Sequence, residues 1–259
     1  MRKRLFVSYV LVLILFVSAC EKNEFPVKSI VDGDTIELEN GTKVRYIGID
    51  TPETRIKQDD GTWSYQPQAY AERSKEFNRN LVEGKKVRLE YDMVQKDKYN
   101  RDLAYVFAGN TFVNAELIRQ GYALLFTIPP NVKYIDLFTE LQKEARENKR
   151  GLWSEINEEP VLPEDAHDYA GKVIYIQGKV LDVYEGRNIV ILNFGKGKKD
   201  FKAVIFKNNL TIFINRNINP SRDYLWKKVR IYGKVKMYKD APEIILDIPD
   251  QIRIMPTLD

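Results

Sequence analysis

The chain has 259 residues, 44% of them hydrophobic and 30% charged, with a formal net charge of +4. That is an ordinary globular composition, long enough for one large core or two small ones. A single histidine makes a zinc site or a Ser-His triad a poor candidate, and a single cysteine excludes an intramolecular disulfide.

The first residues have the pattern of a secretory signal. Basic residues at Arg2–Arg4 precede an apolar run over Leu5–Phe16, which is shorter than the roughly 20 residues that a membrane-spanning helix needs. The only cysteine, Cys20, follows Val17-Ser18-Ala19. This arrangement resembles a bacterial lipobox, which implies that residues 1–19 are removed and that Cys20 carries a lipid anchor. We therefore expect an exported lipoprotein at the bacterial cell membrane, facing outside the cytoplasm.

Residues 20–26 are expected to form a tether, and a first domain is expected over 27–154. Apolar and polar residues alternate over "TIELENGTKVRYIGI" on both sides of Asn40-Gly41, which predicts a β-hairpin. Apolar residues at helical spacing predict three helices, and two further runs predict strands. The predicted helices cover 67–82, 113–121 and 134–149, and the predicted strands cover 85–93 and 102–109.

An acidic segment with two prolines, residues 155–166, is predicted to be a linker. The remainder, residues 167–259, is nearly all strand, which predicts a small barrel whose strands bend at glycines. Between Lys172 and Lys239, sixteen Lys and Arg residues accompany four Asp and Glu residues. This skew favours a surface that binds polyanions over one that is merely solvated. Among the aromatic residues of this half, Tyr184 and Tyr238 are expected to be exposed and able to stack on bases.

Three acidic side chains of the first domain lie on predicted turns joined by short strands. Asp34 follows Gly33, whose conformational freedom permits a tight turn that aims the carboxylate toward the barrel mouth. Asp50 and Glu53 lie on either side of the Thr-Pro pair in "IDTPETR". For this short stretch alone, a solvated turn at a strand end is the simpler interpretation. Together, converging carboxylates near a backbone carbonyl suit a hard cation such as calcium.

Two arginines accompany these carboxylates. Arg45 lies on the strand that leads to Asp50, and Arg101 ends the loop "DKYNR". Guanidinium groups bind phosphate oxygens in pairs and neutralise the charge that develops during phosphoryl transfer. A surface arginine is usually only solvated, but both of these lie beside turns at the same predicted barrel mouth, which favours a phosphate site.

Five segments of the first domain, in order and with suitable spacing, resemble the thermonuclease (staphylococcal-nuclease-like) family. They cover roughly residues 27–153 and read "VDGDTIEL", "VRYIGIDTPET", "DKYNRDLAYVF", "VNAELIRQGYA" and "RGLW". The resemblance implies a five-stranded OB barrel with three helices and calcium-dependent hydrolysis of phosphodiester bonds in DNA and RNA. The second half looks like a nucleic-acid-binding OB fold, so the expected fold class is mainly β with α (α+β), with two five-stranded OB barrels.

Carried over by position, the resemblance assigns the metal and the attacking water to the acidic turns. Asp34 and Asp50 would bind Ca²⁺ through their carboxylates, and Thr51 would bind it through its main-chain carbonyl. Glu53 would orient or deprotonate the attacking water, and both alternatives stay open.

The same resemblance assigns the phosphate to basic residues. Arg45 and Arg101 would hold the scissile phosphate, and Lys98 and Tyr99 would border the phosphate end of a bound nucleotide as substrate-binding residues. The chain departs from the family where tyrosines would pack around the base, because Thr127 and Pro129 stand at those positions.

The loop "IKQDDGTWS" also departs from the family pattern. Its Trp63 is a candidate replacement for the lost aromatic platform, although a loop tryptophan more often packs on its own domain.

The alternative to an enzyme is a catalytically inactive, nucleic-acid-binding lipoprotein. The presence of both arginines and all three carboxylates favours the enzyme. No protein partner can be inferred, and a monomer is expected. We expect the first domain to cleave short oligonucleotides unaided and the second domain to add affinity for long DNA and RNA. The competing expectation is that the second domain only packs on the first and supports its fold.

Overall fold

The structure is a computed structural model that describes residues 24–58 and 60–256, without the side chains of residues 56 and 57. The predicted signal segment and the predicted lipidation site Cys20 lie outside the described residues. Among the described helices, none combines the length and the apolar character needed to cross a bilayer.

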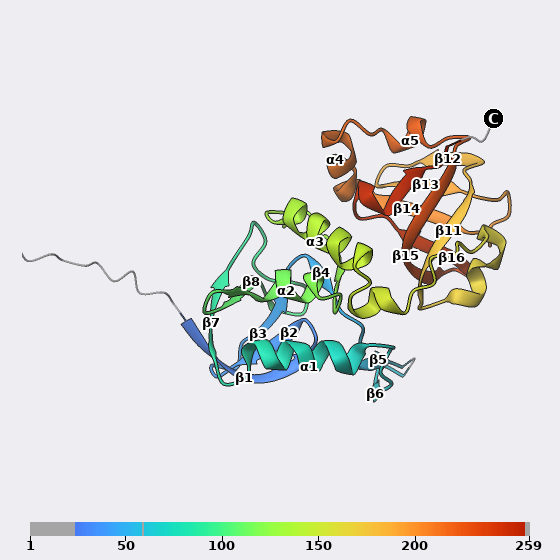
Figure 1. Cartoon of the computed structure of the whole chain (residues 1–259). Helices are drawn as coiled ribbons and strands as arrows, with labels where there is room; N and C mark the ends of the chain where they lie inside the picture. The colour runs from blue at the N-terminus through green and yellow to red at the C-terminus, as the bar shows by residue number, and fades with distance from the viewer. Residues whose placement is uncertain (1–23, 59, 257–259) are drawn as a thin grey trace, which may run out of the picture.

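A five-stranded barrel forms the N-terminal part of the molecule, as the sequence predicted (Figure 1). The strands run in the order β3-β2-β1-β7-β8, and β3 pairs with β8 in parallel to close the barrel. A short strand, β9, pairs with the free side of β8. The bounds are β1 Glu24–Asp32, β2 Thr35–Leu38, β3 Lys43–Tyr46, β7 Lys86–Glu90, β8 Asp102–Ala108 and β9 Thr111–Phe112.

The hairpin predicted around Asn40-Gly41 is confirmed. Strands β2 and β3 pair antiparallel, and Gly41 has a φ of 82°, a left-handed conformation that favours glycine. Strand β1 begins at Glu24, inside the segment expected to be a tether, because residues 24–26 pair with β7. The start of the chain's ordered sheet was therefore placed too late by the change in hydrophobic pattern alone.

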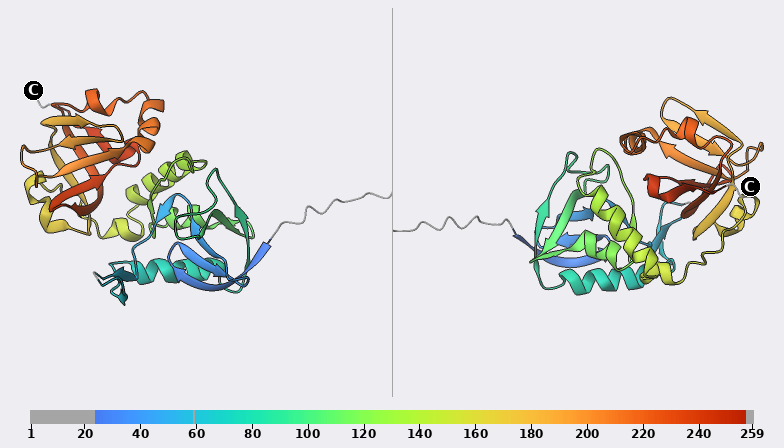
Figure 2. Two further views of the ribbon diagram at one scale, coloured as in Figure 1. Left: turned by 180° about the vertical axis from the view of Figure 1, so that it is seen from behind. Right: turned by 45° about the horizontal axis from the view of Figure 1, so that its top comes forward.

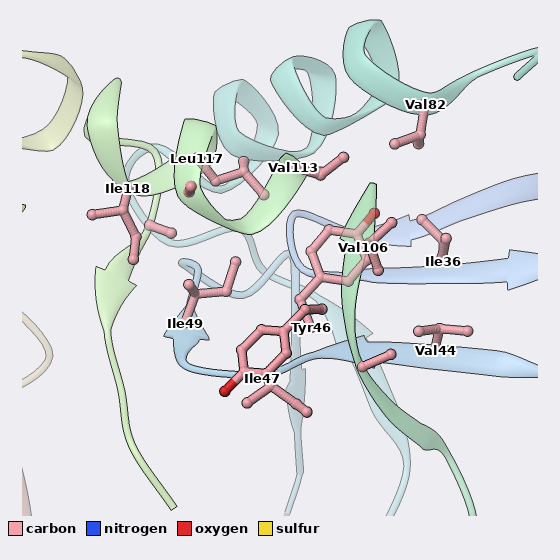
Figure 3. Packing of buried hydrophobic residues seen from close by; sticks show 14 of the residues in the cluster. Ile36, Val44, Tyr46, Ile47, Ile49, Val82, Val106, Val113, Leu117 and Ile118 are labelled. Carbon is pink, nitrogen blue, oxygen red and sulfur yellow. The ribbon is translucent and has the colours of Figure 1, made fainter. Parts of the chain in front are cut away.

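The three predicted helices of this part are present. Helix α1 starts later than the sequence predicted, because Tyr70 has a φ of 69° and so cannot belong to a right-handed helical turn. Figure 3 shows Val82 of α1 and Leu117 of α2 directed at the barrel core beside Ile36 and Val106. These apolar contacts fix the helices on the barrel. The bounds are α1 Ala71–Val82, α2 Val113–Arg119 and α3 Ile135–Glu147.

Two small pairings lie at the mouth of the barrel, in segments predicted to be turns and loops. Strand β4, Ile49–Asp50, pairs antiparallel with β10, Leu124–Leu125. Strand β5, Arg55–Lys57, pairs with β6, Trp63–Tyr65, as a projecting hairpin (Figure 1). Both pairings involve residues next to the candidate site, so they set the positions of its side chains.

A second sheet, which we call the C-terminal sheet, occupies the other half of the molecule. Its strands run in the order β11-β15-β16-β14-β13-β12, with β17 paired to β15 and with β14 and β16 parallel. Within the described residues no pairing joins β11 to β12, so closure into a second OB barrel stays a prediction. The bounds are β11 Val173–Lys179, β12 Asp182–Glu185, β13 Ile189–Asn193, β14 Lys202–Phe206, β15 Lys228–Tyr238, β16 Ala241–Ile245 and β17 Ile252–Ile254.

Helices and 3-10 turns connect and cover the C-terminal sheet. The sequence analysis did not predict α4, because this helix follows β14 directly and no turn residues separate them. The bounds are α4 Lys207–Asn215, α5 Pro220–Asp223, η1 Gly151–Ser154, η2 Pro163–Tyr169 and η3 Pro249–Gln251.

The aromatic residues of the C-terminal sheet divide as expected. Tyr184 is 56% exposed and Tyr238 is 58% exposed, whereas Phe194 and Phe201 are buried in the core. Trp226 and Phe206 are exposed as well, at 60% and 44%, which the sequence did not predict.

The C-terminal sheet packs against the barrel, with α3 between them in both orientations (Figures 1 and 2). The ring of Tyr232 on β15 meets the ring of Trp153 edge to face, 5.7 Å apart. Ile248, which is fully buried, belongs to the same hydrophobic cluster as the barrel core. The two halves therefore share apolar packing as well as a chain connection.

Candidate active site

A cavity of about 500 Å³ opens at the mouth of the barrel, and four of the predicted site residues line it. Asp34, Arg45, Glu53 and Arg101 all line this cavity, which we call the main cavity. The predicted metal ligands Asp50 and Thr51 line a neighbouring cavity instead. The four residues of the main cavity come from four separate segments: the β1–β2 turn, β3, the loop after β4 and the loop before β8. The barrel topology therefore brings together residues that are up to 67 positions apart (34 to 101) in the sequence.

Asp34 is held rigidly against the loop that follows β4. The side chain is 1% exposed, and its Oδ2 accepts hydrogen bonds from the backbone N–H and the hydroxyl of Thr51, at 2.9 and 3.0 Å. A Cβ atom at Gly33 would lie only 2.7 Å from the Thr51 hydroxyl oxygen. Glycine is therefore needed because of this close approach between the two loops, in addition to the turn that the sequence predicted.

The guanidinium group of Arg45 lies between two carboxylates. It forms an ion pair with Asp34 and a second, at 2.8 Å, with Asp50. Burial alone would lower the pKa of Arg45, but the charges of Asp34 and Asp50 outweigh it and raise that pKa. Arg45 therefore binds the carboxylates of Asp34 and Asp50. The two carboxylates share its single positive charge.

This donor set suits a hard divalent cation. Two carboxylates that already share one positive group can share a bound cation, and calcium prefers oxygen ligands of this kind. Among the described residues, no three His, Cys, Asp or Glu side chains converge as a metal site. A calcium ion at Asp34 and Asp50 would therefore need neutral oxygens as well, and Thr51 lies next to both residues.

Glu53 lies in the loop after β4, where Gln68 fixes its backbone. The backbone N–H of Gln68 donates to the Glu53 carbonyl at 3.0 Å, and the Glu53 N–H donates to the Gln68 side-chain oxygen at 3.3 Å. Partial burial of the carboxyl group and repulsion from Asp34, Asp32 and Asp50 raise the pKa of Glu53 to about 7. Since Glu53 as a whole residue is solvent-exposed, we attribute the raised pKa mainly to repulsion from the neighbouring carboxylates. A carboxylate with this pKa is suited to accept a proton near neutral pH.

The sequence interpretation missed Asp32, which lines the main cavity together with Asp34 and Glu53. Its Oδ1 accepts from the Gly33 N–H at 3.0 Å, and its Oδ2 accepts from the Thr54 hydroxyl at 3.4 Å. Burial, together with the charge of Asp34, raises the pKa of Asp32. The signal was present as the Asp-Gly-Asp spacing of residues 32–34, but the strand alternation gave no reason to place both side chains at one mouth.

Comparison with known proteins identifies the family. The family model described as "Staphylococcal nuclease homologue" matches residues 43–155. A thermonuclease of Staphylococcus intermedius is 39% identical over 130 residues, 49% of this chain and 74% of that protein. A thermonuclease of Staphylococcus hyicus is 36% identical over 140 residues, 53% of this chain and 79% of that protein. The chain belongs to the staphylococcal nuclease homologue family.

A further relative of this chain comes from outside the staphylococci. Endonuclease YncB of Bacillus subtilis (strain 168) is 40% identical over 129 residues, which are 48% of this chain and 58% of that protein. The family model ends at residue 155, before the first strand of the C-terminal sheet at Val173. The family assignment therefore concerns the barrel and its helices.

In this nuclease-family barrel, Arg101 reaches the main cavity from a well-ordered loop. Its Nε donates to Asp97 at 2.7 Å, and its backbone N–H donates to the same carboxylate at 3.0 Å. Burial alone would raise the pKa of Asp97, but the hydrogen bonds from Arg101 outweigh it, so the pKa of Asp97 is lowered. The Arg101 side chain keeps 30% of its surface exposed, so it remains accessible to a ligand.

The two other basic-loop residues predicted to bind substrate lie beside the cavity. Neither Lys98 nor Tyr99 is among the described residues that line it. Tyr99 is 69% exposed, and its ring carries the Lys98 ammonium at 5.0 Å and the Arg101 guanidinium at 5.6 Å. Their assignment as substrate-binding residues stays a prediction.

The aromatic environment differs from the one expected of the family. Thr127 is buried, and Pro129 lines a small apolar cavity of about 100 Å³ next to Arg45. Trp63 projects from the β5–β6 hairpin, is 61% exposed, and lines the main cavity, which neither Thr127 nor Pro129 lines. The usual packing of a loop tryptophan on its own domain is therefore not what the structure has.

Proposed function

We propose that the protein is an exported, calcium-dependent nuclease that hydrolyses phosphodiester bonds in DNA and RNA. The observation that carries this proposal is the meeting of Asp34 and Asp50 on one positive group, with Glu53 and Arg101 on the same cavity. The printed names of its relatives, thermonuclease and endonuclease, support hydrolysis of nucleic acid.

Each residue has a role that its position allows. Asp34, Asp50 and the carbonyl of Thr51 would hold calcium, which when bound stabilises negative charge on a phosphate oxygen. Glu53 accepts a proton from the attacking water, or orients that water. The water oxygen bonds to phosphorus while the bond from phosphorus to one ester oxygen breaks, and that oxygen leaves as a hydroxyl group after taking up a proton from solvent water. Arg101, and Arg45 beside it, neutralise the charge that develops on the phosphate.

The C-terminal sheet is proposed to be an accessory nucleic-acid-binding domain without catalysis of its own. The excess of Lys and Arg between Lys172 and Lys239 supports attraction of a polyanion, and the exposed Tyr184 and Tyr238 support stacking on bases. The proposed active-site residues all lie on the barrel.

Export and anchoring remain proposals that rest on the sequence. We propose that Cys20 is diacylated and holds the enzyme at the outer side of a bacterial membrane. Replacing Cys20 with alanine should release the protein or stall its processing. An unchanged membrane fraction, with an unchanged mass of the N-terminal peptide, would contradict this.

The decisive experiment is cleavage of plasmid DNA and of RNA by the mature protein, with calcium and with excess chelator. Cleavage should require calcium and should be lost in Glu53→Gln. Because Glu53 must be ionised to act as a base, the rate should rise as the pH increases through about 7. Full activity in chelator would remove the metal assignment. Nucleic-acid binding without any cleavage would instead favour the inactive binding protein.

A further inference from the structure

One face of β15 is turned toward the barrel. Side chains alternate along a strand, so residues two apart lie on the same face. Tyr232 packs on Trp153, the Lys234 ammonium donates a 2.8 Å hydrogen bond to Gln68, and the Lys236 ammonium lies 5.8 Å from the ring centre of Phe126. Three successive residues of this face therefore contact the nuclease barrel, and two of them are lysines.

A single residue, Gln68, connects the Lys234 side chain to the loop that carries Glu53. The side-chain oxygen of Gln68 accepts from the Lys234 ammonium and from the N–H of Glu53. Burial lowers the pKa of Lys234, and the charges of Asp50 and Glu53 act in the opposite direction. The ammonium is thus electrostatically part of the active site although it belongs to the C-terminal sheet.

The hydrogen-bonding capacity of this ammonium is largely unused. An ammonium has three N–H donors. In the described part of the chain, Lys234 has one hydrogen-bond partner, Gln68, and no carboxylate within ion-pair distance, although the charges of Asp50 and Glu53 still act on it. A half-buried positive charge is costly unless an anion accompanies it. The position therefore suits an anionic ligand.

A second cavity provides the space for such a ligand. It has a volume of about 500 Å³ and adjoins the main site at Asp50 and Thr51. Gln68 and Tyr70 line it from the barrel side, and Lys172 and Lys234 line it from the C-terminal sheet. We call it the inter-domain cavity. Two carboxylates, Asp50 and Glu155, also line the cavity, and each is paired with an arginine. The two lysines and the tyrosine are therefore the groups suited to a phosphate and the nucleotide attached to it.

We propose that the inter-domain cavity is a second substrate subsite, in which Lys234, assisted by Lys172, binds a phosphate of the nucleic-acid strand next to the scissile one. This rests on the proposed nuclease function and extends it, because the substrate track then crosses from one half of the molecule to the other. The competing explanation is that Lys234 only ties the two halves together through Gln68.

The test uses the mature full-length protein in a Glu53→Gln background with calcium, so that binding is measured without cleavage. Affinity for single-stranded DNA on the order of 12 nucleotides is measured by fluorescence anisotropy over a range of salt concentrations. Lys234→Gln removes the charge but keeps a donor for Gln68. Lys143→Gln is the control, because Lys143 is an exposed lysine of α3 that lines neither cavity.

We expect Lys234→Gln to weaken binding about fivefold or more and to reduce the slope of log affinity against log salt by about 0.7, the value for one phosphate contact on a single strand. Lys172→Gln should reduce the slope further, and Lys143→Gln should leave it unchanged. Equal affinity and slope in Lys234→Gln and its parent, with or without a lower melting temperature, would overturn the proposal. The proposed function itself would be overturned if the Glu53→Gln parent did not bind DNA and the protein with Glu53 restored did not cleave it.

Discussion

Arg45 and Arg101 have different surroundings although both are assigned to the phosphate. The Arg45 side chain is 14% exposed and compensates two carboxylates, one of which, Asp34, is buried, whereas Arg101 is 30% exposed and is paired with Asp97. Removing one member of a buried ion pair leaves an uncompensated charge, which costs about 3–5 kcal/mol, whereas an exposed pair contributes about 0–1 kcal/mol.

We therefore predict that Arg45→Ala and Arg101→Ala each lose at least about 2 kcal/mol of transition-state stabilisation, roughly 30-fold in kcat/KM. Only Arg45→Ala should also unfold at markedly lower denaturant concentration. Steady-state kinetics and urea titration measure the two effects. Near-normal turnover in either variant would contradict the phosphate assignment.

Trp63 is the one exposed aromatic ring on the described lining of the main cavity. If it supports a base, Trp63→Ala should raise KM for single-stranded DNA by about fivefold or more, since stacking of one base contributes about 1–3 kcal/mol. Tyr65→Ala is the matched control, because Tyr65 belongs to the same hairpin, is 64% exposed and bonds to Glu72 away from the cavity. Equal KM values for the two variants would assign Trp63 to the solvated surface.

At the scale of elements, the sequence pattern predicted the helices and the hairpin that are determined by residues close together in the chain. The Asn40-Gly41 hairpin and the three helices of the barrel follow from turn chemistry and apolar spacing. The place of Asp32 at the site did not follow, because it depends on a contact with Thr54, which is distant in sequence. The β5–β6 hairpin and the position of Trp63 were missed although their pairing is local, because the segment has no clear alternation of apolar and polar residues. The five main site residues were singled out from their acidic turns and neighbouring arginines, whereas the role of each came from resemblance to a family.

The turn between β16 and η3 buries a carboxyl group. Asp247 is 6% exposed and accepts a 2.8 Å hydrogen bond from Asn209. Burial raises the pKa of Asp247 to about 7, against about 3.9 for an unfolded aspartate. Between these values the folded state binds more protons than the unfolded state, so the free energy of unfolding falls as pH rises through this window.

We predict that Asp247→Asn, which keeps the acceptor for Asn209, stabilises the protein by about 1–3 kcal/mol at pH 8 and by much less near pH 4. Thermal melts of the variant and the parent at both pH values measure this. A stability difference that does not depend on pH would show that the carboxyl group is ionised in the folded protein.

At the scale of the whole molecule, the C-terminal sheet has two separable effects on the barrel. The shared packing of Tyr232 and Ile248 stabilises the barrel, whereas the lysines that face it act on the substrate. The sequence favoured a second domain that adds affinity for long nucleic acid, and the alternative was a second domain that only packs on the first and supports its fold. The structure shows the packing that this alternative requires, and it leaves the binding role as a proposal.

Deleting residues 165–259 should therefore do more than remove affinity for long DNA. We predict a melting temperature several degrees lower, because each kcal/mol lost shifts it by about 2–8 °C, and a red shift of tryptophan fluorescence as Trp153 loses its cover. Turnover on short oligonucleotides should persist at temperatures where the fragment remains folded. The salt dependence of binding to long DNA should become shallower. An unchanged melting temperature would mean that the shared packing contributes little.

The burial of Ile248 among the residues of the barrel core also bears on the order of events during synthesis. A chain leaves the ribosome N-terminus first, and the barrel begins at Glu24. The last apolar side chain of that core therefore emerges after nearly all of the protein has been made. A partly synthesised chain contains every proposed catalytic residue by position 101, yet it still lacks part of the packing beneath them. The nuclease barrel therefore reaches its final packing only after residue 248 has been made.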